Sequence, residues 1–145
     1  EWFRHSRAHN CLTVDNADIS KTVCNVRYEG NSSILASAIN PVYFHDRKVR
    51  VKNKLLAINE TIESKENWSL NYHFAPGTIH IAESNIFIFT KNNTSIKVHI
   101  ESDCNFKVVN TLRTFSRGDA TEAPTITVEG SKGTHTLSIS FHRDL

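Results

Sequence analysis

The chain has 145 residues, of which 39% are hydrophobic and 22% charged, and its formal net charge is +2. Charges of both signs are interspersed, so this mild excess does not indicate a nucleic-acid-binding protein. No apolar run approaches the roughly 18 residues of a transmembrane helix, which excludes a helical membrane span. The length is that of one domain, able to bury roughly 70% of its unfolded surface.

Apolar and polar residues alternate along most of the chain, which is typical of half-buried β-strands. The clearest case is 68–74, where every even position is aromatic or aliphatic. In chain order the expected strands are 11–14, 22–28, 34–39, 42–51, 55–62, 68–74, 78–82, 86–90, 96–100, 105–115, 124–128 and 137–141.

Turn-forming residues separate these strands at 29–31, 40–41, 75–77, 91–93, 118–119 and 130–133. Their spacing is near the roughly 8–12 residues of an antiparallel sandwich, and one polar face per strand favours antiparallel pairing. The segment 119–124 is expected to be a surface loop. The sequence therefore predicts a single all-β domain, an antiparallel two-sheet β-sandwich of about a dozen short strands.

The three cysteines, Cys11, Cys24 and Cys104, leave at least one thiol unpaired within the chain. None belongs to a CxxC pair, which argues against a thiolate zinc site or a redox motif. Each is flanked by strand-like residues, so we expect three buried free thiols.

A basic segment containing His9 runs into the first strand, with Arg4 and Arg7 before it. A lone histidine is more often structural than a ligand, and no GxSxG or HExxH motif supplies His9 with a catalytic partner. As a zinc ligand, it would need two or three further groups brought close by the fold.

A second basic segment follows at 47–54. Lys48, Arg50, Lys52 and Lys54 would lie on one side of an extended strand, about 6–7 Å apart, a spacing that suits uronate or sulfate groups. The alternative is a solvated face neutralised across a hairpin by Glu60, Glu63 and Glu66. His45 and Arg47 share the other face, either as a polar pair supporting the His9 segment or as solvent-exposed residues.

Three stretches resemble the heparinase II/III-like polysaccharide lyases. They are FRHSRAHNCLTVDNADIS (3–20), with its Ala-His-Asn segment, FHDRKVRVKNKLLAINETIE (44–63), and NYHFAPG (71–77), with its His-Phe-Ala-Pro-Gly turn. The resemblance implies the C-terminal β-sandwich of a protein that also has an N-terminal α/α-toroid domain. It implies β-elimination on uronate-containing acidic polysaccharide, with the catalytic residues on the toroid or just upstream and none in this chain.

The resemblance also implies a zinc site in the full-length protein, for which His9 would be the only ligand from this chain, so we expect no metal in this fragment. We expect Arg4, Arg7, Lys48, Arg50 and Lys52 to contact the polysaccharide. Because the chain begins at Glu1 and His9 lies near its start, we expect a C-terminal fragment of a larger protein. The sequence leaves the localisation unknown, and we expect a periplasmic or secreted parent protein. A non-catalytic module that binds acidic glycans and a purely structural interdomain module remain as alternatives.

Overall fold

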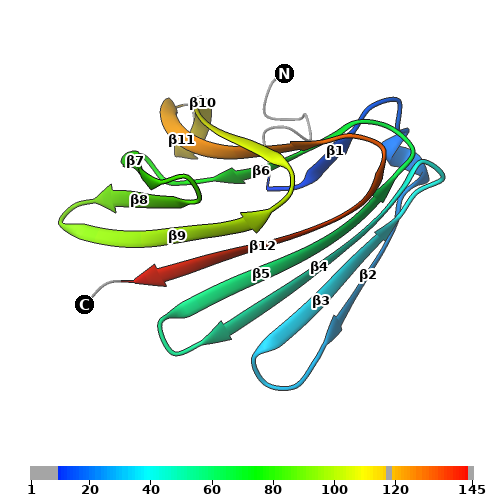
Figure 1. Ribbon diagram of the computed structural model, residues 1–145, viewed down its shortest axis with the longest axis horizontal. Coiled ribbons are helices and arrows are strands. Elements are labelled where there is room, and N and C mark those ends of the chain that lie inside the picture. Colours follow the sequence, from blue (N-terminus) through cyan, green and yellow to red (C-terminus); the bar gives the residue numbers. More distant parts are fainter. Residues whose placement is uncertain (1–9, 117–118, 144–145) are drawn as a thin grey trace.

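The computed structural model describes residues 10–116 and 119–143. These residues form twelve β-strands in two antiparallel sheets, which confirms the predicted sandwich (Figure 1). One 3-10 turn occurs within the described residues, η3 (Ile19–Lys21), and the side chain of Asp18 caps it. In the described part of the chain, no helix has the length and hydropathy of a transmembrane span.

The larger sheet has eight strands in the order β2-β3-β4-β5-β12-β9-β8-β7 and forms the fan-like lower layer of Figure 1. In this order the strands are β2 (Val23–Tyr28), β3 (Ser33–Ile39), β4 (Tyr43–Lys52), β5 (Leu55–Ser64), β12 (Gly133–Arg143), β9 (Thr94–Ser102), β8 (Ile86–Lys91) and β7 (Thr78–Glu83).

The smaller sheet has four strands in the order β1-β6-β11-β10. They are β1 (Leu12–Val14), β6 (Trp68–His73), β11 (Asp119–Gly130) and β10 (Asn105–Ser116). The long pair β10–β11 curls away from the rest of the layer in Figure 1.

The core lies between the sheets because each strand turns its apolar positions inward. Leu70, Ile126 and Val128 of the small sheet are fully buried. Ile62 and Ile139 of the large sheet are equally inaccessible. Burial of each such side chain stabilises the fold by about 1.5–3 kcal/mol relative to full exposure. The core between the sheets therefore supplies most of the apolar stabilisation.

The inner face of the large sheet remains partly exposed over β2–β4. Val26 is 60% exposed and Tyr28 80%, and Ile34 and Val51 are also accessible. The register pairs Val26 with Ala36 and Ala36 with Arg47, so these residues lie on the face that bears His45 and Arg47. We call Val26, Tyr28, Ile34 and Val51 the exposed apolar face.

Two expectations from the sequence are wrong. The segment 119–124 is not a loop, because it forms the first half of β11 and pairs with β10 from Asn110↔Pro124 to Ser116↔Asp119. Pro124 is tolerated there because the β6 ladder begins only at the next residue, Thr125. The cysteines are expected to be buried, but Cys24 is exposed, and Cys11 and Cys104 are only partly buried.

Candidate functional site

A buried carboxylate joins the two sheets beneath the start of the described chain. Glu60 on β5 lies 2.7 Å from His45 Nε2 and accepts a 2.8 Å hydrogen bond from Arg47 Nε, both on β4. Tyr72 on β6 donates to the same carboxylate at 2.8 Å. These four residues, the Glu60 cluster, rule out a solvated face for His45 and Arg47.

The charges within the Glu60 cluster determine its protonation. Burial alone would raise the pKa of the Glu60 carboxyl, but the His45 hydrogen bond, the Arg47 charge and Tyr72 hold that pKa below its ordinary value. Burial and the neighbouring carboxylate raise the pKa of Tyr72 well above its usual range. Tyr72 is therefore a neutral donor and is unsuited to remove a proton from a substrate.

The Glu60 cluster also fixes the chain next to the predicted ligand His9. Arg47 Nη1 donates a 2.6 Å hydrogen bond to the carbonyl of Asn10. The side-chain oxygen of Asn10 accepts a 2.7 Å bond from the backbone N–H of His73. The residue after His9 is thus bound to both sheets. His9, Arg4 and Arg7 themselves lie outside the described residues, so their roles stay predictions.

The basic strand is less uniform than the sequence indicates. Lys48 Nζ lies 2.6 Å from Glu29, which neutralises it. Arg50 and Lys52 are exposed, and no carboxylate of the described chain lies within ion-pair distance of either. Lys54 falls in the turn after β4, out of the row. Glu60 points inward and does not neutralise the basic row.

A polar hollow of about 690 Å³ lies where both sheets meet the β5–β6, β9–β10 and β11–β12 connections. Most of its lining residues are polar, and three of them are acidic. Its lining residues are Asp15, Asn67, Trp68, Ser69, Asn71, Asp103, Cys104, Asn105, Thr111, Thr127, Glu129, Gly130, Ser131 and His135. We refer to it as the polar hollow.

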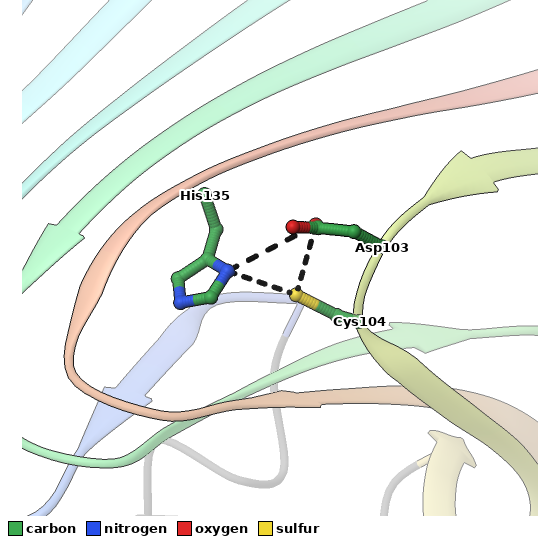
Figure 2. A group of neighbouring side chains, drawn as sticks. All are labelled: Asp103, Cys104 and His135. Atoms are coloured by element: carbon green, nitrogen blue, oxygen red, sulfur yellow. Dashed lines mark hydrogen bonds and ion pairs between the residues drawn. The ribbon is translucent and has the colours of Figure 1, made fainter.

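Three potential metal ligands converge in the wall of the polar hollow (Figure 2). Asp103 and Cys104 lie in the β9–β10 turn, and His135 lies near the start of β12. His135 Nδ1 is 3.3 Å from Cys104 Sγ and 3.9 Å from an oxygen of Asp103, which is itself 3.6 Å from the sulfur. Burial, followed by the charge of Asp103, raises the pKa of the Cys104 thiol despite a hydrogen bond from Ser102.

A chain of hydroxyls and one imidazole continues the polar surface along β6, β11 and β10. Thr125 Oγ1 is 2.7 Å from both His73 Nδ1 and Thr111 Oγ1. Thr127 donates to Asn71 at 2.9 Å. The sequence gives no signal for these threonines. Alternation along the strand predicts that they face solvent, although Thr125 is fully buried.

Comparison with solved structures shows the same fold in structures of heparinase III and of a heparan sulfate lyase. A heparinase III matches with a TM-score of 0.79 and 17% identity over 99% of this chain. The heparan sulfate lyase HepC from Pedobacter heparinus matches with a TM-score of 0.74 and 18% identity over 98%. A further heparinase III structure gives a TM-score of 0.77 at 16% identity.

The chain spans about a quarter of the length of these structures, 25% of the first heparinase III and of HepC. No family model and no curated protein sequence matches it. The likeness therefore lies in the fold, and it confirms that the chain resembles one domain of a heparinase III-type lyase.

Proposed function

We propose that this chain is the β-sandwich domain of a polysaccharide lyase that cleaves uronate-containing acidic glycans by β-elimination. The observation that carries the proposal is the fold likeness, which covers 98–99% of this chain but only about a quarter of heparinase III and HepC. In this proposal the proton-abstracting groups lie on another domain of the parent protein, an α/α-toroid.

The interior of the sandwich supports a non-catalytic role for this domain. β-elimination needs a base that can take a proton from carbon near neutral pH. Tyr72 is kept protonated by burial and by Glu60, and His45 is engaged with the same carboxylate. The Glu60 cluster therefore has a structural role, because it joins the two sheets and binds the carbonyl of Asn10, the residue after His9.

Acidic glycan would be contacted by cations on two parts of the chain. Arg50 and Lys52 are the stronger candidates on β4, because both are exposed and neither is neutralised by a described carboxylate. Lys48 would take part only after leaving Glu29. Arg4 and Arg7, beside His9, would complete the contact, and zinc would bind His9 together with ligands from the rest of the parent protein.

The exposed apolar face is the proposed contact with the remainder of the parent protein. A monomeric domain rarely exposes several large apolar side chains on one sheet face unless a partner covers them. The matched lyases are about four times the length of this chain, so a further domain is available in proteins of this fold. A covalently linked domain is therefore the occupant that the exposed apolar face fits.

The test is an activity assay on the full-length parent protein with heparan sulfate, heparin, chondroitin sulfate and alginate. Product with an unsaturated uronate, followed by its ultraviolet absorbance, is expected from at least one glycan, while the 145-residue chain alone gives none. If the folded parent protein binds an acidic glycan but yields no unsaturated product, the lyase proposal is wrong and the domain belongs to a glycan-binding protein.

A further inference from the structure

We propose that Asp103, Cys104 and His135 form a zinc site whose fourth position opens into the polar hollow. The three ligand atoms come from the β9–β10 turn and from the start of β12, and β12 pairs with β9 through Leu137↔Ser102. That pair brings the start of β12 beside the β9–β10 turn, as Figure 2 shows. This site differs from the one predicted for His9, and it does not depend on the proposed function.

Two of the three separations match the edges of a zinc tetrahedron, and the third is slightly longer. With Zn–S near 2.3 Å and Zn–N or Zn–O near 2.0–2.1 Å, tetrahedral ligands lie about 3.3–3.6 Å from each other. The observed edges are 3.3 Å for Cys104–His135, 3.6 Å for Cys104–Asp103 and 3.9 Å for Asp103–His135. Asp103, with a side chain 73% exposed, is free to close the longest edge by rotation.

The orientation of His135 is the second observation in favour of a metal. Its Nε2 lies 3.0 Å from the carbonyl oxygen of Ser131, which can only accept, so Nε2 carries the proton. In the tautomer with its proton on Nε2 alone, the lone pair of Nδ1 points at Cys104 and Asp103. A carbonyl that fixes the tautomer in this way is the usual outer partner of a zinc-bound histidine.

A catalytic Cys-His-Asp triad does not fit the same residues. In such a triad the carboxylate binds the imidazole nitrogen that does not face the nucleophile. Here Asp103 and Cys104 both face Nδ1, and the backbone of Ser131 occupies Nε2. A metal accounts for the convergence of all three groups on one side of the ring, whereas nucleophilic catalysis does not.

Zinc binding releases one proton, that of the Cys104 thiol, for each metal ion bound. The Cys104 thiol loses its proton to solvent, and the thiolate, the neutral imidazole and the Asp103 carboxylate coordinate Zn²⁺, with water in the fourth position. The lack of a CxxC pair argues only against sites built within one loop. Here Cys104 and His135 are 31 residues apart in sequence and meet through strand pairing.

The experiment is titration of the metal-free 145-residue chain with Co²⁺ and then with Zn²⁺. We expect one equivalent of Co²⁺ to produce a thiolate-to-cobalt absorption band together with tetrahedral visible bands, and Zn²⁺ to abolish both. Cys104→Ser should lose the thiolate band, and Asp103→Asn should weaken binding about tenfold or more. Zinc should also raise the thermal midpoint of the wild-type chain and leave that of Cys104→Ser unchanged.

Two controls separate this site from other ligands in the chain. Cys24→Ser changes an exposed thiol on the edge strand β2 and should retain the full cobalt spectrum. A His9→Ala variant should also retain it, because His9 belongs to the other predicted site. Failure of the wild type to bind, or an unchanged spectrum in Cys104→Ser, would reduce the three residues to a thiol–imidazole hydrogen bond.

Discussion

The phenol of Tyr72 on the small sheet donates a 2.8 Å hydrogen bond to Glu60 on the large sheet, across the sandwich interior. The same carboxylate accepts from Arg47, whose guanidinium also binds the carbonyl of Asn10. Sheet packing and the position of the N-terminal segment are therefore coupled through one buried charge. This coupling yields two predictions on stability.

Replacing Glu60 by Gln should destabilise the chain by about 2–4 kcal/mol, because Arg47 and His45 would lose the charge that compensates their burial. Urea denaturation monitored by tryptophan fluorescence measures the change. Glu63→Gln is the matched control, since Glu63 lies on the same strand but is exposed, and it should stay within about 0.5 kcal/mol of wild type. Equal midpoints for the two variants would contradict the role given to Glu60.

The folded-state pKa of Glu60 lies below its ordinary value of 4.5, which sets the sign of a pH effect. A carboxyl with a lowered folded pKa stabilises the protein above its unfolded pKa, and this contribution is lost as the pH falls through the folded value. Stability should therefore decline below about pH 4.5, and less steeply in Glu60→Gln than in wild type. Parallel profiles for both proteins would show that other carboxylates dominate acid unfolding.

Strand alternation predicted nearly all of the fold because side-chain parity is a local property. The alternation along β5 also indicates that Glu60 faces the interior, since Ile58 and Ile62, two residues before and after it, do so. One of the two interpretations of the basic strand instead made Glu60 a partner of the lysines on a solvated face. The cost of burying the carboxylate is offset by hydrogen bonds with Arg47, His45 and Tyr72, and the sequence alone does not show that these residues meet.

The Asp103–Cys104–His135 group could not be predicted from the sequence, because it depends on the pairing of β9 with β12 and on a turn geometry set by tertiary contacts. The strand at 119–123 was missed for a related reason. Its residues are mostly polar or small, and β10 supplies the partner ladder that makes them a strand. Non-local pairing thus supplied what local pattern could not.

Gly130 leaves room for the indole of Trp68. A Cβ at this position would lie 2.3 Å from two ring atoms of Trp68, which is itself only 3% exposed and cannot move away cheaply. Gly130→Ala should therefore cost about 1–3 kcal/mol through overpacking. Ser131→Ala, the adjacent exposed position, should stay within about 0.5 kcal/mol. Thermal denaturation of both variants measures the difference. A Gly130→Ala variant as stable as wild type would contradict the close packing of Trp68 against Gly130.

The exposed apolar face predicts an effect that appears only in the parent protein. Val26→Lys should leave the isolated chain folded, because Val26 is 60% exposed, but should weaken interdomain packing in the full-length protein. Limited proteolysis between the domains should then become faster. Val23→Lys is the matched control, since Val23 is 68% exposed on the opposite face of the same strand. Equal proteolysis of both variants would place the domain contact elsewhere.

Arg50 and Lys52 should contribute to the binding of acidic glycan by charge. Each exposed ion pair provides about 0.2–1 kcal/mol, so Arg50→Ala/Lys52→Ala should weaken binding of heparan sulfate to the full-length protein by roughly 2- to 30-fold at low salt. The difference from wild type should shrink as added salt screens the contact. Isothermal titration at two ionic strengths measures both effects.

The control for charge alone is Lys91→Ala/Lys132→Ala, which removes the same two units of charge from exposed positions outside the basic strand. Loss of affinity in both double variants would mean that heparan sulfate responds to net charge and not to β4. Loss confined to Arg50 and Lys52 would locate the glycan on the outer face of the large sheet, because these residues alternate with the inward-facing Val49 and Val51. The basic strand and the exposed apolar face would then serve separate partners on opposite faces of one sheet.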